Sequence, residues 1–253
     1  MLQAERRNYI IEVLNRDGRV VIEDLAKVLN VSEMTIRRDL QVLQQHKLIT
    51  RTHGGAVSHD LLAEETPYSK KAEQNMEEKR KIGMYASSLV EEGNVIILDA
   101  GTTSMEIAKG IVGIKNLKVV TNDLMIAAFL SKYEGIGVYC SGGIVQRDTV
   151  ACLGDHAIEL FKSINADIAF VGASSVDIEK GVTTPTAEKA QLKKQLTKSA
   201  KKTILVADSL KFGKVAFVNI CPLTRFDLII TGNRIDKEIE QGIRNLDIEL
   251  ELV

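Results

Sequence analysis

The chain has 253 residues, of which 26% are charged and 45% hydrophobic, and its formal net charge is −1. These values are typical of a globular protein with one or two domains, and they exclude a disordered chain and a uniformly basic, histone-like binder of nucleic acid. Three cysteines without metal-ligand spacing predict neither a disulfide framework nor a metal or cofactor site. No apolar run reaches the roughly 18 residues of a membrane span, and no signal sequence is evident, so we expect a cytoplasmic protein with no membrane partner.

The first 57 residues carry the pattern of a small helical unit. A helix is expected over residues 3–16, where apolar side chains recur at helical spacing until Asp17-Gly18 ends them. A second helix is expected within residues 21–30 and closes at Asn30, which tolerates the left-handed conformation of a tight turn. A third helix starts two residues later. Helix, short turn and helix together predict a helix-turn-helix, in which the second of the two helices enters the DNA major groove.

The third helix, residues 31–48, has one apolar face and one face suited to DNA. Ser32 is a good N-cap, and Ile36, Leu40 and Leu43 form a buried stripe. At about 100° per residue, the opposite face and its flanks hold Met34, Thr35, Arg37, Arg38, Gln41 and Gln45. Arg reads guanine and Gln reads adenine by paired hydrogen bonds, whereas Thr or a second Arg holds phosphate. The alternative interpretation is a solvated helix face without function.

A small β-hairpin is expected next to this helix. Residues 48–57 alternate β-favouring residues with Arg51 and His53 before Gly54-Gly55, a pattern that indicates a wing contacting the DNA backbone. Positive charge is concentrated in this region, because residues 34–57 contain Arg37, Arg38, Lys47 and Arg51 but a single acid, Asp39. The candidate DNA-binding residues are therefore Ser32, Met34, Thr35, Arg37, Arg38, Gln41, Arg51 and His53.

The sequence TIRRDL followed by LITRTHGGA resembles the winged helix-turn-helix of the DeoR family of bacterial transcription regulators. The resemblance covers residues 3–57 almost without interruption. It implies binding to double-stranded operator DNA and, usually, repression. A symmetric homo-oligomer, dimer or tetramer, is expected because one winged helix reads too few base pairs to find its site.

Residues 58–75 are polar, contain Pro67 and lack a sustained period, so they are predicted to be an interdomain linker. Helical spacing resumes over residues 76–92. The expected domains are residues 1–57 for DNA binding and residues 76–253 for an effector, joined by this linker.

From Asn94 onward, short runs rich in Val and Ile alternate with helical segments, which indicates buried parallel strands in an open α/β sheet of Rossmann-like type. The expected strands are residues 95–98, 117–120, 136–139, 168–171, 203–207 and 228–230, with an edge strand within 248–253. The expected helices are residues 103–111, 123–132, 155–163, 187–200 and 235–244.

Small polar residues follow five of these strands, and ligands of open α/β sheets bind beyond the carboxyl ends of strands. The amides and hydroxyls of Gly101, Thr102 and Thr103 suit a phosphate at a helix N-terminus, with Lys211 adding charge. Carboxamide and carboxylate oxygens suit sugar hydroxyls. The candidate effector-binding residues are Asp99, Gly101, Thr102, Thr103, Asn122, Ser141, Gly142, Gly143, Asp208 and Lys211. The alternative for any single loop is a tight turn with a helix cap.

Residues 76–232 resemble the effector-binding domain of the same family through DAGTT, VTND, SGG, VGASSVD, GVTT and DSLKFG. That domain resembles the fold of ribose 5-phosphate isomerase, and the family implies a phosphorylated sugar or polyol as effector. The isomerases carry D-G-A-D-E where this chain has Val171-Gly172-Ala173-Ser174-Ser175, so the carboxylates that would move protons are missing and no catalytic residue is assigned. A ligand-controlled transcription regulator is the leading hypothesis. The alternatives are an isomerase-like enzyme with an appended DNA-binding domain, or a constitutive architectural DNA binder.

Overall fold

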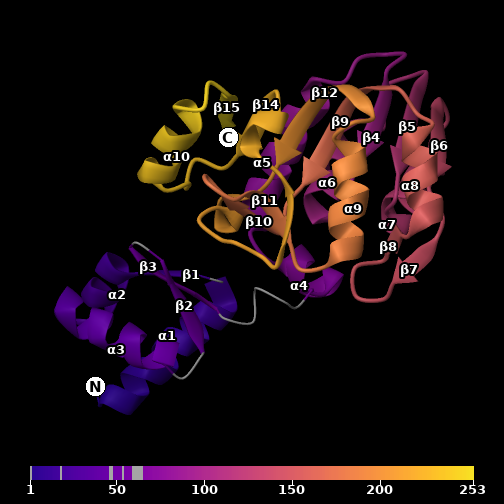
Figure 1. Cartoon of the computed structure of the whole chain (residues 1–253). Coiled ribbons are helices and arrows are strands. Elements are labelled where there is room, and N and C mark those ends of the chain that lie inside the picture. Colours follow the sequence, from indigo (N-terminus) through magenta and orange to yellow (C-terminus); the bar gives the residue numbers. More distant parts are fainter. Residues whose placement is uncertain (1, 18, 46–47, 53, 59–64) are drawn as a thin grey trace. The chain divides into compact units, whose positions relative to one another are not determined.

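The protein forms two compact units, residues 1–64 and 65–253. The structure, a computed structural model, describes residues 2–17, 19–45, 48–52, 54–58 and 65–253. Figure 1 shows the first unit as a small helical body with a short sheet, and the second as a large sheet with helices on both of its faces.

The first unit is a winged helix-turn-helix, as the sequence predicts. Asn30 adopts the left-handed conformation with φ of 50° and closes the second helix, so the turn forms where expected. Ile10, Leu25, Ile36 and Leu40 lie in its core. The elements are α1 (Gln3–Asp17), β1 (Arg19–Val21), α2 (Ile22–Leu29), α3 (Glu33–Gln45), β2 (Ile49–Thr52) and β3 (Gly55–Ser58).

The wing has one more strand than predicted, since β1 pairs with β3 and gives the antiparallel order β1-β3-β2. Gly55 is required at this crossing, because a Cβ there would lie 1.8 Å from the carbonyl oxygen of Val20. Three residues are too short a run for periodicity to reveal β1. The expected hairpin is confirmed, apart from His53, which lies outside the described residues.

The second unit is built on a seven-stranded, fully parallel sheet, with strand order β15-β14-β12-β9-β4-β5-β6. All seven strands were expected. Alternate side chains supply two cores, since Ile96 and Leu98 face one side of the sheet and Ile97 faces the other. The strands are β4 (Val95–Leu98), β5 (Leu117–Thr121), β6 (Ile136–Cys140), β9 (Ala166–Gly172), β12 (Ala200–Val206), β14 (Leu228–Thr231) and β15 (Glu249–Leu252).

Helices cover both faces of this sheet. Ile82, Ile107 and Ile126 belong to one core and Phe161 and Leu192 to the other. The helices are α5 (Met76–Ser88), α6 (Thr102–Gly110), α7 (Leu124–Leu130), α8 (Asp155–Lys162), α9 (Ala187–Leu196) and α10 (Lys237–Arg244). The helix expected over residues 187–200 ends earlier, because residues 200–206 pair with β9 and this pairing overrides local propensity.

Short elements that the sequence did not predict complete the unit. They make a hairpin next to β5 and a three-stranded antiparallel sheet of order β10-β11-β13. They are β7 (Ile144–Gln146), β8 (Ala151–Leu153), β10 (Ser175–Asp177), β11 (Gly181–Thr184) and β13 (Val218–Cys221), with 3-10 turns η2 (Ser209–Lys211) and η3 (Leu223–Arg225).

The expected linker of residues 58–75 differs from the structure in its second half. Residues 65–75 belong to the second unit and contain α4 (Tyr68–Glu73). The backbone amide of Tyr68 donates to the carbonyl of Asp148 at 2.7 Å, and Lys71 pairs with Glu65. Polar contacts rather than an apolar stripe hold α4, which is why periodicity did not reveal it. Residues 59–64 lie outside the described part of the chain.

Candidate functional site

The candidate DNA-reading face of α3 is exposed. Met34, Arg38 and Gln41 point to solvent on the side opposite the buried Ile36 and Leu40. The residues expected to read bases therefore lie on one accessible helix face, as a major-groove helix requires.

Two further candidates of this helix have structural roles at its start. The amide of Thr35 donates to the Ser32 hydroxyl at 3.2 Å, so Ser32 is the N-cap, and the two hydroxyls lie 2.9 Å apart. Arg37 forms a half-exposed ion pair with Glu33 at 3.4 Å. Arg51 is exposed on β2, the strand that begins the wing.

Asp39 is a residue of this unit whose role the sequence analysis missed. Its carboxylate is fully buried and accepts hydrogen bonds from Nε of Arg6 at 2.5 Å and Nε of Arg7 at 2.9 Å. These bonds tie α1 to α3. Asp39 lies three residues after Ile36, on the buried stripe, and an acid at such a position was the available signal.

Arg38→Ala should lower operator affinity by about 1–3 kcal/mol and relax base preference, because it removes a guanidinium from the reading face. Arg51→Ala should weaken binding to all sequences alike, as loss of a phosphate contact does. A gel-shift comparison of operator and scrambled DNA measures both. Unchanged affinities for Arg38→Ala would show that α3 does not read DNA.

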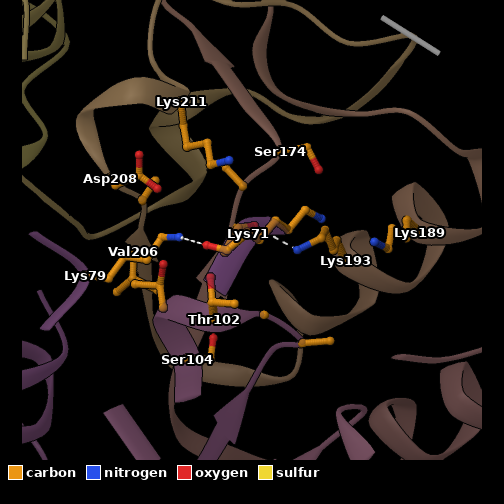
Figure 2. Close-up of a pocket in the computed structure, with 16 residues that line it drawn as sticks. Lys71, Lys79, Thr102, Ser104, Ser174, Lys189, Lys193, Val206, Asp208 and Lys211 are labelled. Carbon is orange, nitrogen blue, oxygen red and sulfur yellow. Dashed lines mark hydrogen bonds between the residues drawn. The ribbon is translucent and has the colours of Figure 1, made fainter. Parts of the chain in front are cut away.

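The second unit has a pocket at the carboxyl ends of β4, β9 and β12, where the sequence analysis placed the effector. Figure 2 shows five lysines around it, contributed by α4, α5, α9 and η2. The lining residues are Lys71, Lys79, Ala100, Gly101, Thr102, Thr103, Ser104, Gly172, Ala173, Ser174, Lys189, Lys193, Val206, Ala207, Asp208 and Lys211.

The N-terminus of α6 opens into this pocket without a cap. The first hydrogen bond of the helix runs from the amide of Met105 to the carbonyl of Gly101 at 3.0 Å, and no side chain caps the helix. In the part of the chain that the structure describes, the amides of Thr102, Thr103 and Ser104 therefore have no acceptor. Three such donors, together with the positive end of the helix dipole, are the arrangement that binds anions at helix N-termini.

Buried side chains hold the loop before α6 in place. The amide of Ala100 donates to Oδ1 of Asn122 at 3.0 Å, and the amide of Gly101 donates to Oδ2 of Asp123 at 3.0 Å. The carboxylate of Asp99 accepts from the amide of Gly172 at 2.9 Å and from Lys193. The loop is thus fixed before any ligand arrives.

These bonds change the roles expected for two residues. Asp99 and Asn122 were expected to bind sugar hydroxyls, but neither lines the pocket and their oxygens accept hydrogen bonds from the protein. Asp208 does line the pocket, with Oδ1 accepting from Leu210 and Asn75, both at 3.2 Å.

The segment Ser141, Gly142 and Gly143 is also outside the pocket lining. It follows β6, the edge strand, which is separated from β4 by β5. The sequence could not give this order of strands. Of the predicted effector residues, the structure brings together Gly101, Thr102, Thr103, Asp208 and Lys211.

Four of the five pocket lysines were missed. Lys71 and Lys189 both pair with Glu65, at 2.5 and 2.8 Å, and Lys193 pairs with Asp99. Lys79 donates to the carbonyls of Lys71 and Gln74. The sequence signal for these lysines was the spacing of Lys189 and Lys193, which lie one helical turn apart on α9. Two lysines at this spacing more often mark a solvated helix face.

The lysines make the pocket electropositive. Among the described lining residues, five lysines stand against one carboxylate, that of Asp208. The carboxylates that pair with the lysines, Glu65 and Asp99, are not part of the lining. Burial, together with the charge of nearby Lys189, lowers the pKa of Lys71 to about 8. Burial likewise lowers the pKa of Lys79 to about 8, with a contribution from Lys211. An anion bound here would relieve this repulsion.

Comparison with known proteins identifies the class to which this arrangement belongs, a DNA-binding regulator with a sensor domain. Two family models match, the DeoR-like helix-turn-helix domain over residues 6–61 and the DeoR C terminal sensor domain over residues 74–233. The chain belongs to the DeoR family of transcription regulators and binds DNA.

The relatives match over nearly the whole chain. The uncharacterized HTH-type transcriptional regulator YgbI of Escherichia coli (strain K12) is 36% identical over 250 residues, covering 99% of this chain and 98% of the relative. The HTH-type transcriptional regulator GlpR of Haloferax volcanii is 38% identical over 249 residues, covering 98% and 97%. The HTH-type transcriptional repressor GlcR of Bacillus subtilis (strain 168) is 35% identical over 231 residues, covering 91% and 89%.

Among solved structures, ribose 5-phosphate isomerase A of Methanocaldococcus jannaschii is similar with a TM-score of 0.40 and 18% identity, covering 55% of each chain. This likeness concerns the fold alone. Of the helices that the structure describes, none has the length and apolar character needed to cross a membrane.

Proposed function

We propose that the protein is a repressor of a carbohydrate-utilisation operon, acting in the cytoplasm, whose operator affinity is set by a phosphorylated sugar or polyol bound in the lysine-lined pocket. The observation that carries the proposal is the uncapped N-terminus of α6, where the amides of Thr102, Thr103 and Ser104 face an electropositive cavity. The relative GlcR, which is named a transcriptional repressor, supports repression as the direction of control.

The pocket suits the two halves of such a ligand differently. The α6 amides with Lys211 would bind the phosphate, since backbone N–H groups and ammonium groups are the usual partners of phosphate oxygens. Asp208 and Ser174 would accept hydrogen bonds from hydroxyls on the rest of the molecule. An unphosphorylated sugar would leave the α6 amides and the lysines without their anion.

The proposal assigns sensing rather than catalysis to this pocket. Among the lining residues of the described chain, Asp208 is the carboxylate, and its Oδ1 accepts two hydrogen bonds from the protein. Moving a proton between neighbouring carbons of a sugar needs a carboxylate free to take it up. Isomerisation of a bound sugar phosphate, followed by NMR, would contradict this assignment.

The proposal includes a symmetric homo-oligomer, because one α3 helix spans only a few base pairs and a genome offers many competing sites. Footprinting should therefore show two or more half-sites. Protection of one short half-site at saturation would contradict it.

A thermal-shift screen of phosphorylated sugars and polyols, each paired with its unphosphorylated form, tests the proposed ligand class. A ligand at 100 times its dissociation constant stabilises the folded state by about 2.7 kcal/mol. We expect this shift from at least one phosphorylated compound and none from its unphosphorylated partner. Equal shifts from both forms would show that the pocket does not select phosphate.

Affinity for the phosphorylated ligand should fall as the pH rises through about 8. Lys71 and Lys79 have pKa values of about 8 without ligand, and a bound dianion raises them, so binding takes up protons above that pH. Linkage then predicts a loss of up to about tenfold in affinity per pH unit for each proton taken up. Calorimetry at pH 7 and pH 9.5 measures the change, and an affinity independent of pH would place the phosphate away from these lysines.

A further inference from the structure

Two cysteines that are distant in sequence meet at the end of β6. Cys140 is the last residue of β6 and pairs in register with Thr121 of β5. Cys152 lies in β8, and its amide donates to the carbonyl of Asn122 at 2.7 Å. The two residues are thus the backbone neighbours of consecutive positions, 121 and 122, and their side chains interact. A disulfide needs Cα atoms about 4.4–6.8 Å apart, a distance on the order of the spacing between neighbouring strands.

The two thiols differ in access to solvent. Cys140 is exposed, whereas Cys152 is 1% exposed, and both are free thiols in this structure. Burial and the adjacent Cys140 raise the pKa of Cys152 to about 11. An oxidant in solution therefore reaches Cys140 first, with Cys152 placed behind it as the second thiol of a pair.

We propose that Cys140 and Cys152 form a reversible thiol–disulfide site that a peroxide oxidises. Its oxidation state changes how firmly the backbone that lines the pocket is held. In the first step the Cys140 sulfur attacks the peroxide, and an S–O bond forms as the O–O bond breaks. The products are a sulfenic acid on Cys140 and one molecule of water. In the second step the Cys152 sulfur attacks that of Cys140, the S–S bond forms, and the hydroxide leaves as water with the proton of Cys152. The two thiols lose two electrons, the peroxide is reduced to two waters, and a thiol reductant reverses the change.

Hydrogen bonds connect this pair to one wall of the pocket. The carbonyl of Cys152 accepts from Nδ2 of Asn122 at 3.4 Å, and Oδ1 of the same side chain accepts from the amide of Ala100 at 3.0 Å. Ala100 precedes the uncapped start of α6. A shift of Cys152 on closing the S–S bond therefore acts on the backbone that presents the α6 amides.

The β7–β8 hairpin connects the same pair to a second segment of the pocket lining. The backbone carbonyl of Asp148, between the two strands, accepts from the amide of Tyr68 at 2.7 Å. Tyr68 begins α4, which carries the pocket residue Lys71. Oxidation at Cys152 thus acts on two segments that line the pocket. The significance of this coupling for gene control rests on the proposed function, but the disulfide itself does not.

The test uses the reduced full-length protein treated with hydrogen peroxide, followed by thiol titration after denaturation and peptide mass spectrometry. We expect the three titratable thiols to fall to one, with a peptide linked through Cys140 and Cys152 and recovery of all three on reduction. Cys221→Ser, the matched control, should keep the linkage, since Cys221 lies on β13 outside the pair. Cys152→Ser should instead accumulate Cys140 sulfenic acid that dimedone traps. Cys152→Ala, which buries no hydroxyl, replaces that variant if it fails to fold.

A Cys140 sulfinic acid beside a reduced Cys152, or linkage of Cys140 between two molecules, would overturn the intramolecular disulfide. The coupling is measured by hydrogen exchange of the peptide covering residues 99–105, without ligand, in the oxidised and reduced protein. We expect exchange rates to differ on the order of fivefold, the ratio that corresponds to about 1 kcal/mol. Equal rates would overturn the coupling. Neither experiment uses a sugar phosphate. A negative result in either one is therefore distinguishable from a negative result in the ligand screen that tests the proposed function.

Discussion

Asp39→Ala should destabilise the N-terminal unit by about 3–5 kcal/mol, although Asp39 has no place on the DNA-reading face. The substitution removes the buried carboxylate that pairs with Arg6 and Arg7 and leaves the largely buried Arg6 guanidinium without its partner. Breaking a buried ion pair from one side costs this much because the remaining charge stays desolvated. DNA binding should be lost with the fold of residues 1–64.

Hydrogen exchange of peptides from α1 and α3 measures this destabilisation without interference from the larger unit. Glu33→Ala is the matched control, since Glu33 is an acid of the same helix and its ion-pair partner, Arg37, is half-exposed. That control should change stability by no more than about 0.5 kcal/mol. If Asp39→Ala changed exchange no more than the control, the pair with Arg6 and Arg7 would not hold α1 to α3.

Lys211→Ala should weaken binding of the phosphorylated ligand by about 1.5–3 kcal/mol, roughly 10- to 150-fold, the range for a hydrogen bond to a charged group. Among the residues that the structure describes, the ammonium of Lys211 makes no hydrogen bond or ion pair, so its charge is available to an anion. Loss of a lysine with no such partner should leave stability and ligand-free DNA affinity near those of the wild type.

Calorimetric titration of the wild type and Lys211→Ala measures the loss. Lys180→Ala, a change at an exposed lysine in the turn between β10 and β11, is the control and should bind as the wild type does. An unchanged dissociation constant for Lys211→Ala would make Lys211 a solvated surface lysine.

The sheet of the second unit could be predicted from sequence because its strands are buried on both faces and appear as continuous runs of Val and Ile. The runs at residues 95–98 and 228–230 match β4 and β14 to within one residue. Strands of three residues, such as β7 and β8, have no detectable period. The hairpin they form, which holds Cys152, could therefore be found only in the structure.

The pocket was predicted in position but not in composition. Small polar residues at strand ends located Thr102, Thr103 and Lys211 correctly at its edge. The same rule included Asn122, whose amide group is occupied by the backbone of Ala100 and Cys152, and sequence does not reveal which polar side chains the protein itself satisfies. Lys71 was missed because a lysine in a polar stretch indicates solvent, and only the fold places Glu65 beside it.

Titration of an operator complex with the ligand found by thermal shift tests the central claim most directly, because it joins the two units in one measurement. Fluorescence anisotropy of labelled operator DNA would follow binding by the full-length protein with a phosphorylated compound, and with its unphosphorylated form. We predict a change in operator affinity of about 5- to 150-fold, the usual range of allosteric coupling, with the phosphorylated compound alone, and the same factor in ligand affinity when operator is present. Operator affinity that stayed constant at saturating ligand would contradict control of DNA binding through this pocket.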